Sequence, residues 1–137
     1  MAKTLKVEIA TPDRQVYSGE AEMVVAPGVQ GELGVLPRHT HLMAALDTGE
    51  MRLTVGGKIK RYAVSAGFME VTPERAMVLA DSAELAEEIS VERAQKAVDR
   101  ARQRLRKAAR EEPEINPDRA KLALIRAINR LRVAKKK

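Results

Sequence analysis

The sequence predicts an α+β protein, with an amino-terminal antiparallel β-sandwich or barrel followed by a carboxy-terminal antiparallel α-helical hairpin. The first part of the chain holds short alternations of apolar and polar residues separated by turn residues. All eight glycines lie between residues 19 and 67, whereas the chain after residue 88 is rich in Ala, Arg, Leu and Lys. Because strands repeat every two residues and helices every 3.6, these patterns indicate a sheet and then helices.

Strands and turns alternate along the first part of the chain. Residues 5–9 (LKVEI) have the period-two pattern of a half-buried strand. The segments TPDR (11–14) and TPER (72–75) place proline at the second position of a turn. Residues 77–80 (MVLA) predict a further short strand. The three aromatic residues of the chain leave an aliphatic core.

A hairpin is predicted in the middle of this part. The patterns of residues 51–55 and 58–64 predict two strands, and Gly56 and Gly57 lie between them. A type I′ turn needs positive φ at both central positions, which two glycines supply.

The first predicted helix follows Ser90, a favourable N-cap residue. Apolar residues recur at intervals of three and four and form one continuous seam on this helix: Val91, Ala94, Val98, Ala101, Leu105 and Ala108.

The second predicted helix starts at Asn116-Pro117-Asp118, which combines an N-cap, proline at the first helical position and an acid near the positive end of the helix dipole. Its seam, which Leu122, Ile125 and Ile128 widen, consists of Ala120, Leu124, Ala127, Leu131 and Ala134. The segment EEPEI at 111–115 contains a helix breaker, so the two helices fold back antiparallel. The many alanines give this hairpin little apolar area of its own, and we expect it to need a docking surface.

A change of charge coincides with the change of structure. Residues 89–137 hold 16 Lys and Arg against 6 Asp and Glu, whereas residues 1–88 hold 9 against 13. The boundary between an acidic body and a basic tail lies near residues 84–90, so we predict a sandwich at 1–86 and a hairpin at 87–137.

The composition limits the chemistry. With no cysteine, the chain forms no disulfide or thiolate zinc site and has no cysteine nucleophile. No stretch approaches the roughly 20 apolar residues of a membrane helix, and the first residues lack the apolar stretch of a signal peptide, so we expect any membrane association to be peripheral.

Two local features invite an active-site interpretation, and neither supports one. The glycine-rich run at 28–34 lacks the Lys-Ser/Thr ending of a phosphate-binding loop and is predicted to be a structural loop. His39 and His41 lack an evident third ligand for a metal. We therefore expect no catalytic residues and no metal site. The basic helices leave open a nucleic-acid-binding module, although the usual signatures and stacking aromatics are missing.

Four segments in order resemble the epsilon subunit of bacterial F-type ATP synthase. They are GELGVLPRH at 31–39, SAGFMEV at 65–71, ISVERA at 89–94 and RAINRL at 126–131. The first is similar to that family's Gly-Glu-x-Gly-Ile-Leu-Pro-x-His loop and the second to its Ser-Gly-Gly-Phe-x-Glu-Val strand. The resemblance covers nearly the whole chain and favours this reading over the nucleic-acid alternative.

The resemblance implies a central-stalk role without catalysis. The sandwich would bind the gamma subunit and the ring of c subunits, with Gly31, Glu32 and His39 in a loop that faces the c ring. The helices would fold on the sandwich or extend toward the alpha/beta catalytic head and inhibit ATP hydrolysis. The protein would be peripheral, at the cytoplasmic face of the bacterial plasma membrane, with no nucleic-acid partner.

The resemblance also implies a nucleotide site without a required cofactor. The residues that match the family's nucleotide-contacting positions are Glu84, Ile89, Arg93, Arg100, Arg126 and Arg130. Ser90 stands where members with high nucleotide affinity have aspartate. We therefore expect ATP to be, at most, a weak regulatory ligand.

Overall fold

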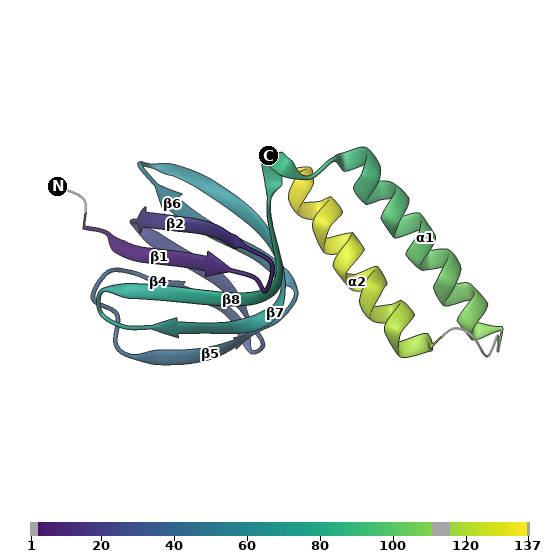
Figure 1. Ribbon diagram of the computed structural model, residues 1–137, viewed down its shortest axis with the longest axis horizontal. Coiled ribbons are helices and arrows are strands. Elements are labelled where there is room, and N and C mark those ends of the chain that lie inside the picture. Colours follow the sequence, from purple (N-terminus) through teal and green to yellow (C-terminus); the bar gives the residue numbers. More distant parts are fainter. Residues whose placement is uncertain (1–2, 111–115, 137) are drawn as a thin grey trace. The chain divides into compact units, whose positions relative to one another are not determined.

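Figure 1 shows the computed structural model, which describes residues 3–110 and 116–136. The chain divides into two compact units, residues 1–85 and residues 86–137. The first unit contains the strands and the second contains the helices. A β-sandwich followed by a helical hairpin is the predicted fold class, and it is confirmed.

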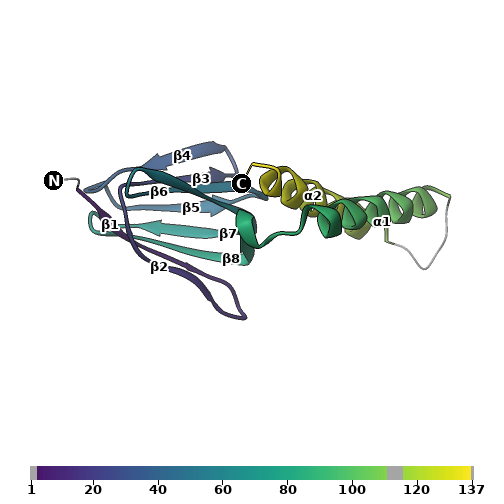
Figure 2. The same cartoon turned by 90° about the horizontal axis from the view of Figure 1, so that it is seen from above.

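The first unit is an eight-stranded sheet folded into two layers. Its strands are β1 (Leu5–Ala10), β2 (Gln15–Ala21), β3 (Met23–Gly28), β4 (Gly31–Val35), β5 (Leu42–Leu46), β6 (Gly49–Val55), β7 (Lys58–Val71) and β8 (Arg75–Leu85). They pair in the order β2-β1-β8-β7-β5-β3-β4, and β6 pairs with β3 and β7. In Figure 2, β3 and β4 lie in one layer and β7 and β8 in the other.

The pairing of β1 with β8 is parallel, whereas the other strand pairs described are antiparallel. Parallel neighbours need a long connection. Here, six strands separate β1 from β8 along the chain, and this length lets β8 return in the same direction as β1.

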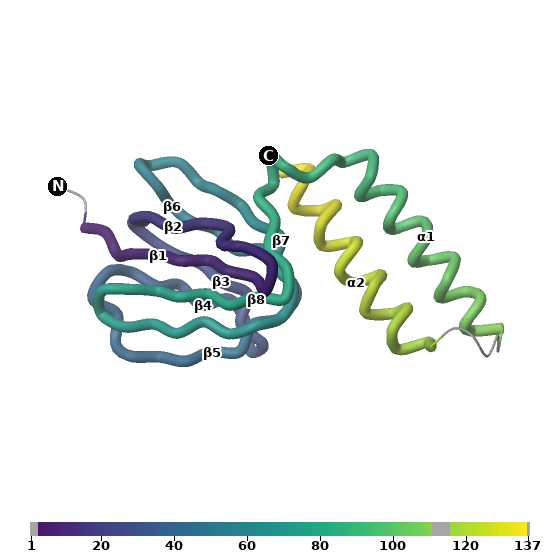
Figure 3. Tube along the Cα trace, viewed as in Figure 1, coloured from purple at the N-terminus to yellow at the C-terminus, as the bar shows by residue number. Residues whose placement is uncertain are grey.

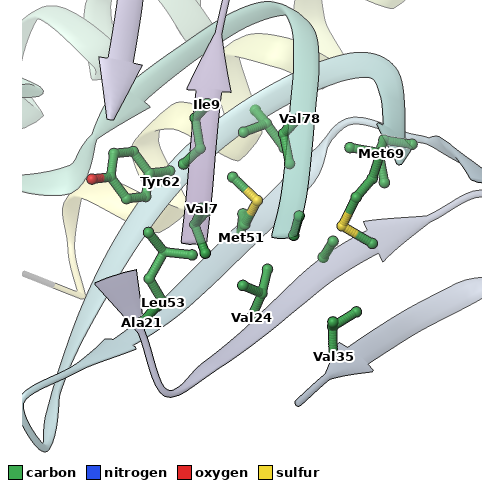
Figure 4. Close-up of a cluster of buried hydrophobic side chains, with 14 of the residues drawn as sticks. Val7, Ile9, Ala21, Val24, Val35, Met51, Leu53, Tyr62, Met69 and Val78 are labelled. Atoms are coloured by element: carbon green, nitrogen blue, oxygen red, sulfur yellow. The ribbon is translucent and has the colours of Figure 1, made fainter. Parts of the chain in front are cut away.

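The core between the layers is aliphatic, as predicted. Figure 4 shows side chains from both layers that meet there, and those with no exposed surface include Val7, Ile9, Val24, Met51, Leu53, Met69 and Val78. Tyr62 is the buried aromatic residue of this cluster. The ring of the partly exposed Tyr17 packs edge-on against it, with 6.5 Å between the two ring centroids. Burial, with a smaller contribution from Glu20, raises the pKa of Tyr17 above its usual value.

The hairpin predicted around Gly56 and Gly57 is confirmed, because β6 and β7 pair there and both glycines have positive φ, 58° and 78°. The strand predicted at 77–80 is part of the longer β8. The glycine-rich run at 28–34 is not a loop but the β3–β4 hairpin. Gly28 and Gly31 allow this tight turn, since a Cβ atom on Gly28 would lie 2.7 Å from the Gly31 carbonyl oxygen.

The second unit consists of a 3₁₀ turn, η1 (Ala86–Glu88), and two helices, α1 (Val91–Ala109) and α2 (Pro117–Ala134). The helices lie side by side and run in opposite directions (Figure 3), as predicted. Both predicted N-caps are present. The Ser90 hydroxyl accepts a hydrogen bond from the Arg93 amide at 3.2 Å, and the Asn116 side chain accepts from the amides of Asp118 and Arg119.

Small side chains form much of the hairpin seam. The predicted seam residues that are buried are Ala94, Val98, Ala101, Ala108, Ala120, Ala127 and Ala134. The prediction that Leu122 and Ile125 widen the seam is wrong, because both side chains are exposed. At about 100° per residue, Leu122 points roughly 200° away from Ala120 and therefore lies on the opposite face of α2. The predicted linker at 111–115 lies outside the described residues.

Candidate functional site

The sandwich residues predicted to face the c ring do not share one loop. Gly31 and Glu32 lie at the start of β4, and His39 lies beyond its end, in the connection to β5. Three residues of strand separate Glu32 from the end of β4, which corresponds to about 10 Å. Residues 31–35 pair with β3 in an antiparallel register, in which Glu32 is opposite Pro27, so Glu32 lies on a strand and not in a loop.

Glu32 is already engaged by an arginine. Its carboxylate accepts two hydrogen bonds from the Arg52 guanidinium, at 3.0 and 3.4 Å. Arg52 also lies 4.0 Å from Glu50, which pairs with Arg61 at 2.6 Å. The four side chains form a row of alternating charges across neighbouring strands. Exposed pairs of this kind contribute about 0–1 kcal/mol, so Arg52 orients Glu32 without holding it strongly.

A groove borders the same carboxylate. It has a volume of about 410 Å³ and lies between the β3–β4 hairpin and β5, lined by residues 28–33 and 42–45. Gly31 and Glu32 line this groove and His39 does not.

The backbone beside His39 adopts a less common conformation. Arg38 has φ of 67°, in the left-handed region, and its amide donates to the Pro73 carbonyl at 2.8 Å. The His39 Nδ1 donates to the Thr40 carbonyl oxygen at 2.8 Å. The bond from Arg38 ties this connection to the β7–β8 turn, next to His39.

An exposed apolar patch on the sandwich was not predicted. Met43, Phe68 and Leu79 are 64%, 59% and 54% exposed, and Phe68 is the register partner of both Ala45 and Leu79. We call Met43, Ala45, Phe68 and Leu79 the Phe68 patch. The signal in the sequence is the consecutive pair Phe68-Met69. Since neighbouring strand residues point to opposite faces and Met69 is buried, Phe68 must point outward.

The predicted nucleotide residues are divided between the units. Glu84 lies on β8 in the first unit, half-buried and in register with Ala63. The other five lie in the second unit. Ile89 is buried just before α1, Arg93 and Arg100 are exposed on α1, and Arg126 and Arg130 lie one turn apart on α2.

The antiparallel arrangement brings the start of α1 beside the end of α2 (Figure 3). Arg93, in the first turn of α1, therefore lies at the same end of the hairpin as Arg130, whereas Arg100 lies at the middle of α1. Among the described residues, no carboxylate forms an ion pair with Arg93, Arg100 or Arg126. These guanidinium groups are available to an anionic ligand or an acidic protein surface.

Both units match family models in the order in which they occur. Residues 4–86 match the model described as "ATP synthase, Delta/Epsilon chain, beta-sandwich domain". Residues 87–135 match "ATP synthase, Delta/Epsilon chain, long alpha-helix domain". The chain belongs to the ATP synthase delta/epsilon family.

Curated members of this family are similar over most of their length. The chain is 54% identical over 105 residues to the ATP synthase epsilon chain of Desulforamulus reducens, covering 77% of this chain and 80% of the relative. It is 51% identical to that of Carboxydothermus hydrogenoformans, covering 77% and 78%. It is 49% identical to that of Halalkalibacterium halodurans, covering 79% and 81%. The predicted resemblance to the epsilon subunit is confirmed.

Two solved structures support the architecture. A chain in the Euglena gracilis mitochondrial ATP synthase structure of OSCP, F1 and c-ring aligns with a TM-score of 0.74 and 23% identity, covering 89% of this chain and 76% of that chain. A chain in the Tetrahymena thermophila mitochondrial ATP synthase central stalk and c-ring structure aligns with a TM-score of 0.52 and 12% identity, covering 63% and 69%. At these identities the likeness shows the fold alone.

The part of the chain that the structure describes has neither a membrane-spanning helix nor a metal-binding cluster. None of its helices there is long and apolar enough to cross a lipid bilayer. No group of three or more His, Asp or Glu side chains there is placed to hold a metal ion.

Proposed function

We propose that the chain is a central-stalk subunit of an F-type ATP synthase, which couples rotation of the c ring to the catalytic head and regulates ATP hydrolysis. The observation that carries this proposal is the match of both units, in order, to the delta/epsilon family. In this role the chain contributes no catalytic residues and acts through contacts with other subunits, peripheral to the cytoplasmic face of the bacterial plasma membrane.

The Phe68 patch is the part of the sandwich best suited to bind the gamma subunit. Three large apolar side chains on adjacent strands are more than half exposed there. Contiguous exposed apolar patches mark protein interaction sites, and aromatic residues and methionine are enriched in such interfaces. Burying this patch against gamma would stabilise the complex by about 25 cal/mol for each Å² of apolar area.

Co-purification with tagged gamma tests this contact. Phe68→Ser should abolish or strongly weaken retention of the chain. Ile59→Ser is the matched control, because Ile59 is 52% exposed on the same strand but lies beside the Gly56–Gly57 turn. Equal retention of both variants would exclude the patch, and failure of the unaltered chain to bind gamma would remove the main proposal.

The Glu32 end of β4 is proposed to face the c ring, together with Gly31 and His39. The positions support this in one respect, since the Glu32 carboxylate is exposed and oriented by Arg52. Glu32→Gln should lower ATP-driven proton pumping in the reconstituted enzyme while ATP hydrolysis persists. Thr48→Gln is an exchange at a polar site outside this row of charges and should leave pumping unchanged.

The helices are proposed to inhibit ATP hydrolysis. The hairpin exposes arginines such as Arg93, Arg100 and Arg126, which form no ion pair with a carboxylate of the described residues, and such side chains suit an acidic surface on the alpha/beta head. Removal of residues 89–137 should raise hydrolysis by the assembled enzyme, and neutralising Arg126 and Arg130 should reproduce part of the increase. The arginine effect should shrink at high salt, since exposed charges are screened. Unchanged hydrolysis after the truncation would refute inhibition but not coupling.

ATP is proposed as a weak regulatory ligand of the same hairpin. At Ser90, the hydroxyl already serves as the N-cap of α1, and aspartate caps a helix about as well. An added carboxylate acceptor is expected to tighten ATP binding by roughly ten- to a hundredfold. Calorimetric titration of Ser90→Asp should show that gain, and adding Arg93→Ala should reverse it. Tight binding by the natural sequence would contradict this argument.

A further inference from the structure

The row of alternating charges on the sandwich contains two arginines that lie directly opposite each other. Arg52 on β6 and Arg61 on β7 are register partners, and their side chains are 28% and 29% exposed. Like charges at directly opposite positions destabilise strand pairing, since the two Cβ atoms are only about 5 Å apart. Each guanidinium group therefore needs a carboxylate that draws it away from the other.

Glu50 lies within reach of both arginines and is bound more closely by Arg61. It precedes Arg52 by two residues on β6, so the two side chains point to the same face of the sheet. The Arg61 guanidinium donates to the Glu50 carboxylate at 2.6 Å, whereas Nη1 of Arg52 lies 4.0 Å from it. The Glu50 side chain is only 10% exposed, and a carboxylate so far removed from water depends on a counter-charge.

Arg52 turns instead toward β4, on the far side of β3. The residues of β3 that alternate with its buried ones are Val25 and Pro27, whose side chains have no hydrogen-bonding group. The Arg52 guanidinium reaches past them and donates two hydrogen bonds to the Glu32 carboxylate, at 3.0 and 3.4 Å. Because the Glu32 side chain is 58% exposed, these bonds select one of the several rotamers that it could adopt in water.

Two carboxylates thus compete for Arg52. Because Arg61 neutralises Glu50, the attraction of Glu50 for Arg52 is offset, and the Arg52 guanidinium is left to Glu32. Loss of Arg61 would remove a counter-charge from a mostly buried carboxylate, and Arg52 is the next guanidinium in the row. A buried charge that loses its counter-charge costs more than an exposed ion pair contributes, so Arg52 would turn back to Glu50 and release Glu32.

We propose that Arg61 is a positioning residue for Glu32: by occupying Glu50, it directs Arg52 to the Glu32 carboxylate. This inference rests on the proposed contact of Glu32 with the c ring. It adds that the direction of the carboxylate at this contact is set from β7, which β3 and β6 separate from β4. The partner then meets a negative charge in one fixed orientation.

ATP-driven proton pumping by the reconstituted enzyme, divided by its rate of ATP hydrolysis, tests the proposal. Arg61→Gln should lower this ratio about two- to fivefold, and Arg52→Gln should do the same, because the exposed ion pair that holds Glu32 is lost in both. Arg61→Lys keeps the charge that neutralises Glu50 and should lower the ratio less than Arg61→Gln.

An ion pair elsewhere on the sandwich provides the matched control. Lys6 lies 3.4 Å from Glu8 on β1, outside the row of alternating charges. Lys6→Gln also removes one cation from a surface ion pair, and it should leave the ratio of pumping to hydrolysis unchanged.

A second substitution distinguishes positioning from a merely structural role. In Arg61→Gln/Glu50→Gln the competing carboxylate is removed as well, so Arg52 returns to Glu32 and the ratio should recover. A structural role of Arg61 predicts instead that the second change leaves the ratio low or lowers it further. The double variant also keeps the test decisive if Arg61→Gln alone fails to fold, because it retains no buried carboxylate at this position.

NMR of the full chain separates this inference from the contact with the c ring. The signal of the Arg52 Nε–H group should shift when Glu32→Gln is introduced into the natural sequence. It should not respond to Glu32→Gln in a chain that already carries Arg61→Gln, because Arg52 then binds Glu50.

The outcomes that overturn each idea differ. Unchanged pumping with Glu32→Gln would refute the contact with the c ring, and the NMR comparison would still decide the role of Arg61. Unchanged pumping with Arg61→Gln, while Glu32→Gln lowers it, would overturn the positioning role alone. An equal loss with Lys6→Gln, or an Arg52 signal that responds to Glu32→Gln with and without Arg61, would overturn it as well.

Discussion

The arginines of the two units differ in their partners. On the sandwich, Arg52 and Arg61 form ion pairs with Glu32 and Glu50. On the hairpin, Arg104, Arg119 and Arg126 form no ion pair with a carboxylate of the described residues. The sandwich therefore balances much of its charge internally and exposes an apolar patch, whereas the hairpin keeps unbalanced positive charge. The first arrangement suits lasting apolar contact, and the second suits reversible, salt-sensitive contact with anions.

The two units also differ in what holds them together. The sandwich buries large aliphatic side chains such as Leu53 and Met69 completely. The buried residues of the hairpin seam are mostly alanine, with Val98 as the largest of those on α1. Because stabilisation scales with apolar area removed from water, we expect a cooperative sandwich and a hairpin that opens at lower free energy.

The largest effect is expected from Gly67→Ala. A Cβ atom there would lie 2.0 Å from the Leu79 carbonyl oxygen and 2.8 Å from the Ala80 Cα, so β7 and β8 would have to separate. The free energy of unfolding should fall by about 4 kcal/mol or more. Urea denaturation measures it. Gly34→Ala is the control, because its Cβ atom would meet only the flexible end of Met23. A loss below about 1 kcal/mol for Gly67→Ala would contradict the close approach of the strands.

A matched pair of valines compares the units directly. Val78 on β8 and Val98 on α1 are 0% and 1% exposed. Val78→Ala should lower the stability of the sandwich by about 2–3 kcal/mol, because two methyl groups are removed from a closed core. Val98→Ala should instead increase amide hydrogen exchange in α1 and leave the sandwich transition unchanged. Equal effects of both changes on one shared transition would show that the two units unfold together.

The helix caps should have smaller effects, limited to the hairpin. Ser90→Ala and Asn116→Ala each remove an acceptor for amides at the start of a helix. Each should cost about 1 kcal/mol of helix stability. Circular dichroism at rising temperature measures the loss, and Ser90→Asp should retain the cap. A change in the sandwich transition would contradict the separation of the units.

The smallest effect is expected at Arg38. This residue has φ of 67°, a region in which side chains other than glycine are disfavoured. Arg38→Gly should remove the strain but also increase the entropy of the unfolded chain, for a net stabilisation of about 0.5 kcal/mol. Arg38→Ala keeps the conformation and should not stabilise. Thermal unfolding of both variants provides the comparison, and a gain with alanine would exclude backbone strain as the cause.

The sequence predicted features that depend on neighbouring residues. The N-caps at Ser90 and Asn116 and the turn at Gly56 and Gly57 were located correctly. Motif order identified the family, because the matching segments extend over both units. The glycine-rich run at 28–34 predicts a loop, whereas the structure has the β3–β4 hairpin there, since glycines can also permit a tight turn between paired strands.

For this chain, the sequence alone determined the fold class, the starts of both helices and the charge division, because periodicity, capping and composition act over a few residues. Tertiary structure decided which distant residues meet. Arg52 reaches Glu32 across β3, Phe68 joins Leu79 on one exposed face, and Arg104 and Arg119 face one groove. Strand register and helix pairing set these juxtapositions, and both depend on packing of the whole unit rather than on local sequence.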